Sequence, residues 1–226
     1  MAEQLGFDLP SRTALGRDAF FVSPANAVAL AMIDGWESWA GGKLVLTGPE
    51  SAGKTHLAHV WAEMSGARIV AARDLTEAEV PALARGHVAV EDVPQIAGDP
   101  QAETALFHLH NLVLAEGHRI LFTGEASVAQ WGLSLPDLKS RLQGTTAAVL
   151  EAPDDALLSA LLVKLFADRQ LSPKPEVIPY LVGRMDRSFA GAIALVERLD
   201  AASLAQKRPI TRQLAAQVLD NLPEGA

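Results

Sequence analysis

Cysteine is absent from the 226 residues, so disulfide bonds and thiolate metal sites are both excluded. A protein without disulfides suits a reducing compartment. No basic segment followed by an apolar one comes after Met1, so we expect no secretory signal. No nearly uncharged apolar stretch reaches the roughly 18 residues that cross a bilayer. These absences together predict a cytoplasmic protein without a membrane segment.

Basic residues are also scarce. Lysine and arginine number 19 against 27 aspartates and glutamates, which gives a net charge of -8. This balance argues against a protein that wraps duplex DNA by neutralising its phosphates. Hydrophobic residues make up 49% of the chain, which excludes intrinsic disorder. The length allows one large domain, or a domain with a smaller appendage.

The first two thirds of the chain alternate between strand and helix patterns. Short apolar runs bounded by turn residues predict strands at 43–47, 68–71, 87–93, 119–123 and 147–150. Helical spacing follows the first four of them, with Asp74 expected to cap a helix over 75–85 and Asp99 the helix after it. Such alternation predicts an α/β fold with a five-stranded parallel sheet.

The pattern changes after Glu151, where four helical segments follow one another. They cover about 154–169, 175–184, 187–204 and 210–221, with Asp154, Asp186 and Thr211 as expected caps. We therefore predict a small all-α domain behind the α/β core.

A phosphate-binding loop lies between the first strand and its helix. The fixed glycines let backbone N–H groups surround an anion, the lysine reaches the β and γ phosphates, and the threonine hydroxyl binds Mg²⁺. The alternative is an ordinary glycine-rich turn with a solvated lysine, which the flanking strand and helix argue against. The G-x4-G-K-[ST] pattern consists of Gly48, Pro49, Glu50, Ser51, Ala52, Gly53, Lys54 and Thr55.

The third strand ends in two carboxylates, Glu91 and Asp92, at the edge of the sheet where such folds bind ligands. Beside a phosphate loop, we expect Glu91 to hold Mg²⁺ and Asp92 to orient or deprotonate water. A solvated loop start is the alternative for paired acids at a strand end.

Together these segments resemble the AAA+ ATPases of the replication-initiator branch, the DnaA-like proteins, over nearly the whole chain. Residues 48–57 look like the family's Walker A segment and residues 88–95 like its Walker B segment. The resemblance implies a P-loop AAA+ core with a five-stranded parallel sheet and a helical lid, binding ADP or ATP with Mg²⁺.

The resemblance also implies roles for single residues. Arg141, within residues 135–142, would be an arginine finger that acts in trans on a neighbour's nucleotide. Arg187 would be the sensor arginine in the first turn of a lid helix, where a nearby phosphate would offset the helix dipole. Glu125 stands at sensor 1, and His56 follows the Walker A threonine. Phe21, Val22 and Asn26 resemble the adenine-side segment.

We expect only the motor unit here, without the helix-turn-helix domain of initiators, and hence no sequence-specific contact with duplex DNA. The chain therefore looks most like the short Hda-type regulators, which act with the sliding clamp on the initiator's ATP. Such regulators begin with a clamp-binding peptide, which Gln4, Leu5, Phe7 and Leu9 resemble. A tail that packs Phe7 on its own domain is the alternative.

Two departures from the initiator pattern bear on hydrolysis. Glu91 replaces the first of two aspartates, and Ala126 follows Glu125 where an arginine is common. The phosphate-binding loop is complete, so the sequence favours nucleotide binding over ATP hydrolysis by this chain alone. An autonomous ATPase, such as a helicase loader or an initiator paralogue, and a metabolic P-loop kinase remain alternatives.

The expected organisation is a tail over residues 1–18, an AAA+ core over 19–151 and a lid over 152–226. Expected partners are the sliding clamp, an initiator ATPase and further copies of the chain. His108 and His110 point to different faces of one helix, so a shared metal is not expected. Trp36, Trp39 and Trp61 are expected in the core or an interface.

Overall fold

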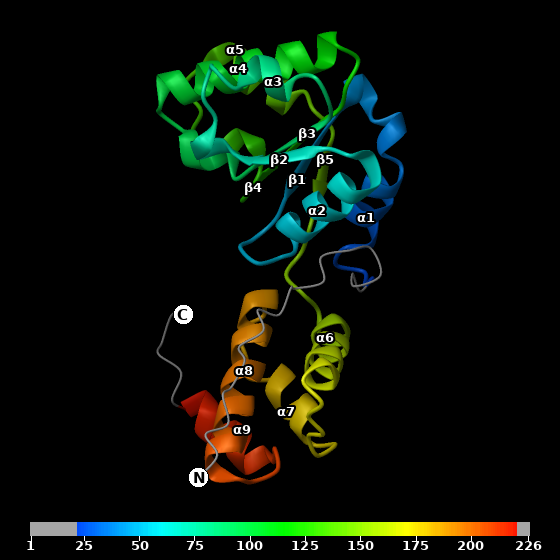
Figure 1. The fold of residues 1–226 in the computed structure, drawn as a ribbon, viewed down its shortest axis with the longest axis vertical. Helices are drawn as coiled ribbons and strands as arrows, with labels where there is room; N and C mark the ends of the chain where they lie inside the picture. The colour runs from blue at the N-terminus through cyan, green and yellow to red at the C-terminus, as the bar shows by residue number, and fades with distance from the viewer. Residues whose placement is uncertain (1–21, 221–226) are drawn as a thin grey trace, which may run out of the picture.

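The computed structural model describes residues 22–220, which form an α/β core and a helical domain beneath it (Figure 1). The core holds five strands: β1 (Lys43–Thr47), β2 (Arg68–Ala71), β3 (Val88–Glu91), β4 (Ile120–Gly124) and β5 (Ala147–Val149). Their order in the sheet is β2-β3-β4-β1-β5, and each neighbouring pair is parallel. The predicted five-stranded parallel sheet is confirmed.

Helices cover both faces of the sheet (Figure 1). One face carries α1 (Ala27–Asp34) and α2 (Lys54–Ser65), and the other carries α3 (Val80–Leu83), α4 (Pro100–Ala115) and α5 (Pro136–Gln143). The alternation of side chains along β1 explains this layering. Leu44 and Leu46 pack in the cluster beneath α1 and α2, whereas Val45 packs in the opposite cluster with α4.

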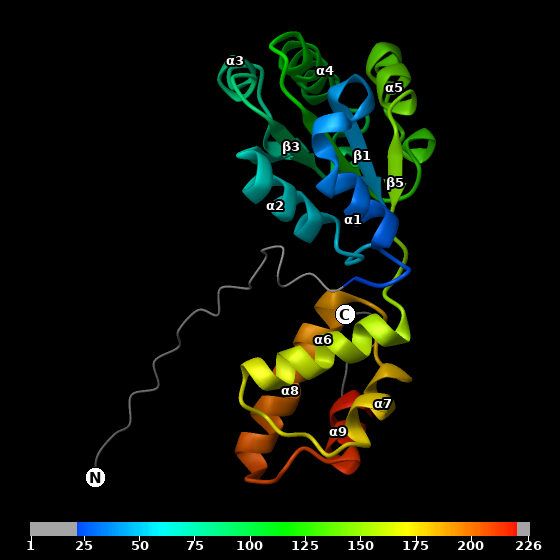
Figure 2. The same cartoon turned by 90° about the vertical axis from the view of Figure 1, so that its right-hand side faces the viewer.

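The second domain contains α6 (Asp155–Asp168), α7 (Val177–Val182), α8 (Phe189–Gln206) and α9 (Arg212–Asp220). It has an apolar core of its own, which Leu162, Phe166, Val196 and Leu199 fill. In Figure 2 the chain leaves β5 and enters α6 directly, so the lid stands below the end of the sheet to which the strands point. Within residues 22–220, no helix has both the length and the apolar character needed to cross a bilayer.

Several local predictions need correction. The helix expected over 75–85 is reduced to α3, because Pro81 sits at its start, and Asp74 lies in a short 3-10 helix (Ala72–Asp74) instead of capping it. The third strand ends at Glu91, and a 3-10 helix (Val93–Ile96) follows. Helix α1 was not predicted. Asp99 and Asp154 do cap their helices through their carboxylates.

Candidate functional site

The loop after β1 has a backbone that requires glycine at two places. A Cβ on Gly48 would lie 2.5 Å from the carbonyl oxygen of Leu150, because the end of β5 passes directly beside the loop. Gly53 has a φ of 102° as the N-cap of α2, a left-handed conformation that glycine adopts without strain. The sequence pattern thus folds into a tight strand–loop–helix turn, in which the first N–H groups of α2 have no partner within the helix and can bind an anion.

Lys54 lies across this loop and is nearly buried, with 7% of its surface exposed. Its Nζ donates hydrogen bonds to the carbonyl oxygens of Gly48 at 2.9 Å and Pro49 at 2.7 Å. Burial lowers the pKa of Lys54 below its ordinary value, although the charges of Glu125, Asp92 and Glu50 oppose the shift. Three carboxylates from three segments therefore lie near enough to act on the charge of the ammonium group.

The acidic end of β3 adjoins β4. Asp92 has a φ of 54°, and its backbone N–H donates to the Thr123 hydroxyl at 3.0 Å, which fixes the turn after the strand. The Oε1 atom of Glu91 is buried and has no hydrogen-bond partner among the described residues. A buried carboxylate oxygen without a donor is costly, which favours a ligand at this position.

Glu125 follows β4, next along the sheet. Its carbonyl oxygen accepts a 2.7 Å hydrogen bond from the Trp131 indole, which holds the turn, and its side chain is exposed. The ends of β1, β4 and β5 border an open cavity of about 550 Å³ beside the phosphate loop. The cavity is lined by Thr47, Gly48, Pro49, Glu125, Ala126, Ser127, Val149 and Leu150.

A cation of the P-loop type would suit these residues. Mg²⁺ in nucleotide sites usually takes one or two protein ligands, with phosphates and water supplying the rest. The exposed Thr55 at the start of α2 and the unpartnered oxygen of Glu91 fit that donor set. Among the described residues, no group of three histidines, cysteines or carboxylates could hold a metal by itself.

The lid contacts the loop at the beginning of α8. The backbone N–H of Phe189 donates to the carbonyl oxygen of Ser51 at 3.3 Å. Ser188 is the N-cap of α8, and its hydroxyl accepts from the N–H of Gly191 at 2.9 Å. The prediction that Asp186 caps this helix was wrong, because Asp186 instead accepts a hydrogen bond from the Ser188 hydroxyl.

Arg187 precedes Ser188 and so lies outside α8, not in its first turn as predicted. Its guanidinium forms an ion pair with Asp155 at 2.6 Å and donates to the Pro153 carbonyl oxygen at 3.0 Å. Both partners belong to the beginning of α6 and the segment that leads into it. The arginine thus stands where the lid joins the core.

The adenine-side segment lies near the same junction. Asn26 is buried, and its side-chain oxygen accepts from the Ser23 N–H at 2.9 Å. The Ala25 carbonyl oxygen accepts from Glu151 at 3.1 Å, which joins this segment to the linker into the lid. Val22 is 58% exposed. Phe21 lies outside the described residues, as do Gln4, Leu5, Phe7 and Leu9.

Arg141 stands at the other end of the core. It is exposed on α5, with its guanidinium 5.3 Å from the centre of the Phe107 ring. Its carbonyl oxygen accepts from the Nζ of Lys43, the first residue of β1, at 3.1 Å. The phosphate loop begins where β1 ends, so the structure does not bring Arg141 to the loop of its own chain.

Sequence reasoning missed Glu103, a fully buried carboxylate on α4. It accepts hydrogen bonds from the N–H groups of Gly98, Ser134 and Leu135 and from the Ser134 hydroxyl. Burial alone would raise the pKa of Glu103, but these hydrogen bonds outweigh it and hold the pKa below its ordinary value. Ser134 and Leu135 directly precede α5, so Glu103 fixes the entry to the helix that carries Arg141.

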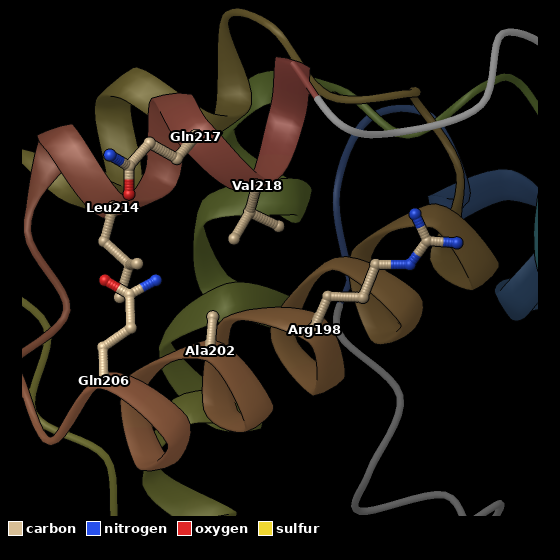
Figure 3. Close-up of a pocket in the computed structure, with 6 residues that line it drawn as sticks. All are labelled: Arg198, Ala202, Gln206, Leu214, Gln217 and Val218. Atoms are coloured by element: carbon tan, nitrogen blue, oxygen red, sulfur yellow. The ribbon is translucent and has the colours of Figure 1, made fainter.

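A second cavity, of about 450 Å³, lies in the lid between α8 and α9 (Figure 3). Gln206 and Gln217 lie at one end and Arg198 at the other, and Ala202 of α8 faces Val218 of α9 between them. It occupies the half of α8 that is remote from the phosphate loop. The cavity is therefore separate from the nucleotide site.

Solved structures with the same architecture show which fold this is. Domain III of the replication initiation protein DnaA from Thermotoga maritima is similar over 96% of this chain and 100% of its own, with a TM-score of 0.79 and 18% identity. AMPPCP-bound DnaA from Aquifex aeolicus matches over 84% of this chain and 67% of its own, with a TM-score of 0.67 and 21% identity. The Holliday junction branch migration motor RuvB of T. maritima matches over 91% of this chain and 71% of its own, with a TM-score of 0.71 and 16% identity. The chain therefore has the AAA+ fold of DnaA and RuvB.

The lid gives a narrower match. Residues 154–219 fit the family model described as the lid domain of Hda. The helical domain is thus similar to the lid domain of Hda, and it stands behind a core with the fold of DnaA domain III. These matches confirm the predicted fold and the resemblance to DnaA-related proteins.

Proposed function

We propose that this chain is a nucleotide-binding AAA+ regulator which, with the DNA polymerase sliding clamp, promotes hydrolysis of ATP bound to a DnaA-type initiator in the cytoplasm. Such an activity would repress renewed initiation of chromosome replication. Three features support the proposal: the phosphate loop, the Hda-type lid and the position of Arg141.

The position of Arg141 carries most of the argument. Lys43 begins β1 and binds the Arg141 carbonyl, whereas Thr47 ends β1 and leads into the phosphate loop. A five-residue strand separates its first and last Cα atoms by about 13 Å. An exposed arginine at the end of the sheet away from the phosphate loop supports a role at the nucleotide of another molecule, as an arginine finger requires.

The chain's own nucleotide would occupy the phosphate loop beneath the lid. Phosphate oxygens would replace the carbonyl oxygens that now accept from Lys54, because the charged ammonium binds phosphate more strongly than a neutral acceptor. Thr55 and Glu91 would hold Mg²⁺, which neutralises phosphate charge when bound. Asp92 and Glu125 would orient water, and Arg187 would contact phosphate from the lid side. Glu50, Ala52 and His56 would line the loop, with Phe21, Val22 and Asn26 on the base.

We place the clamp-binding contact at Gln4, Leu5, Phe7 and Leu9. A glutamine, aliphatic and aromatic set in a short tail can anchor in an apolar pocket of a partner. Deleting residues 1–9 should abolish clamp binding, measured by surface plasmon resonance with immobilised clamp, and leave nucleotide binding intact. Unchanged clamp affinity would discard the assignment.

The decisive experiment follows a single turnover of radiolabelled ATP preloaded on a DnaA-type initiator, with clamp loaded on DNA and this chain added. Arg141→Ala should reduce hydrolysis toward the initiator's basal rate, a loss of up to about 10³-fold. Arg73→Ala is the matched control, since Arg73 is an exposed arginine at another place on the core. Equal rates for wild type and Arg141→Ala would contradict the proposal.

The same preparations separate this function from an autonomous ATPase. The isolated chain should bind ADP or ATP and turn ATP over slowly at most. Rapid turnover by the isolated chain that Lys54→Ala abolishes would instead favour a motor or loader.

A further inference from the structure

A second cation accompanies Arg141 at the same end of the sheet. The Lys43 ammonium lies 3.1 Å from the Arg141 carbonyl oxygen, to which it donates one hydrogen bond. An ammonium group has three donors, so two remain for other acceptors. The hydrogen bond holds the Lys43 charge beside the helix turn from which the guanidinium extends.

The two charges lack a counter-ion within residues 22–220. The ion pairs there involve Asp74, Asp155, Asp168 and Glu197 as acids, and neither Lys43 nor Arg141 takes part in one. Phe107 supplies the only ring that Arg141 covers in this part of the chain. The amino end of β1 therefore carries a local positive field on a chain whose net charge is -8.

The pKa of a buried histidine responds to these two charges. His110 on α4 is 1% exposed, and its Nε2 atom has no hydrogen-bond partner among the described residues. Burial and the charges of Lys43 and Arg141 lower the pKa of His110 to about 4, against the hydrogen bond with Asn111 that raises it. Burial and Arg141 also lower the pKa of Lys43. Burial is the larger cause of both shifts, and the smaller contribution of the two cations has the sign that would favour an anion beside them.

We propose that Lys43 and Arg141 form a two-cation site that receives the terminal phosphates of a nucleotide held by the partner protein. The inference rests on the proposed function and adds Lys43 to it. The guanidinium offers a planar pair of donors to phosphate oxygens, and the ammonium offers a compact point charge next to it. Lys43 thereby shares with the arginine the charge that builds up on the phosphates during hydrolysis.

The test uses the initiator assay with single-charge variants of the full chain. Lys43→Gln should slow hydrolysis of initiator-bound ATP by about 10- to 100-fold, and Lys43→Arg should restore most of the rate. Lys139→Gln is the matched control, because Lys139 lies two residues before Arg141 and thus on another face of α5. Thermal unfolding of each variant checks that the fold is kept.

The outcomes separate the two proposals. If Arg141→Ala abolishes stimulation while Lys43→Gln leaves it at the wild-type level, the two-cation site is wrong and the proposed function stands. If the wild-type chain gives no stimulation, the proposed function is wrong, and a binding experiment decides the site by itself.

That experiment titrates inorganic tripolyphosphate into the Lys54→Ala chain, in which the phosphate loop is disabled, and follows the His110 imidazole by NMR. The His110 resonances should shift, and adding Lys43→Gln or Arg141→Ala should remove the shift. His110 resonances that stay fixed in the Lys54→Ala chain would overturn the two-cation site.

Discussion

Arg187 and Asp155 form an ion pair at 2.6 Å that ties the loop before α8 to the first turn of α6. Arg187 also binds the Pro153 carbonyl, so its guanidinium is engaged within the lid and its linker. The same guanidinium cannot hold Asp155 and a phosphate in full at once. The ion pair therefore competes with the phosphate contact proposed for this arginine.

Releasing Arg187 should strengthen nucleotide binding. Asp155 is 75% exposed and Arg187 47%, so their pair contributes at most about 1 kcal/mol to stability. Asp155→Asn should tighten the binding of a fluorescent ADP analogue by up to about fivefold, a gain of about 1 kcal/mol. Arg187→Ala should weaken it. The control is Asp168→Asn, which breaks the comparable Lys164–Asp168 pair on α6; an equal gain there would refute the competition.

Glu103 should be a main determinant of stability in the core. Glu103→Gln places an amide N–H₂ group among N–H donors from Ser134 and Leu135, leaving buried donors unpaired. We expect a loss of about 2–3 kcal/mol in the free energy of unfolding, measured by urea denaturation at pH 7. Glu116→Gln, at the exposed end of the same helix, should change it by less than about 0.5 kcal/mol.

The pH dependence of that loss has a defined sign. The folded pKa of Glu103 lies below its ordinary value, so its contribution is complete above the unfolded pKa and disappears as pH falls through the folded pKa. The difference between wild type and Glu103→Gln should therefore narrow below pH 4.5. A constant difference down to pH 3 would show that charge is not the cause.

Much of the core was predictable because its signals are local. The apolar runs at 43–47 and 68–71 coincide with β1 and β2, and the phosphate loop fell between a strand and a helix as predicted. A parallel strand buried on both sides, such as β1, leaves a continuous apolar stretch that a sequence reveals directly. The alternation with helices then determined the sheet type.

The unpredicted features depend on residues far apart in the sequence. Lys43 and Arg141 are 98 positions apart, and Glu103 binds residues 31 and 32 positions later. Arg187 was expected to begin a helix, but Ser188 is the N-cap of that helix. The guanidinium of Arg187 instead binds Asp155, which lies 32 positions earlier. Such pairings depend on how the helices pack on the sheet, which the periodicity of apolar residues in the sequence does not reveal.

Thr55 and Glu91 should mediate the effect of Mg²⁺ on nucleotide affinity. Thr55→Ala and Glu91→Gln should each lower the affinity for ATP about tenfold when it is measured with Mg²⁺ by calorimetry. Neither should change ATP binding in EDTA, because the loop N–H groups and Lys54 act without the metal. Glu63→Gln on the outside of α2 removes an equivalent charge and should have no effect. Equal losses with and without Mg²⁺ would show that these side chains act on the fold of the loop.

His110 should make the fold less stable in mild acid. Its folded pKa of about 4 lies below the ordinary 6.5, so the folded state favours the neutral ring. Its contribution is complete above pH 6.5 and is lost as pH falls toward 4, because the unfolded chain takes up the proton first. Between pH 7.5 and pH 5, protonation of this histidine in the unfolded chain lowers the free energy of unfolding by about 2 kcal/mol.

Urea denaturation of wild type and His110→Leu at both pH values measures that cost. The variant has no ring to protonate, so its stability should fall by about 2 kcal/mol less than that of the wild type over this interval. His108→Leu on the exposed side of the same helix should behave as the wild type. Because Lys43 and Arg141 contribute to the shift, Arg141→Ala should also reduce the pH dependence. Parallel pH profiles for wild type and His110→Leu would show that His110 does not titrate between the two states.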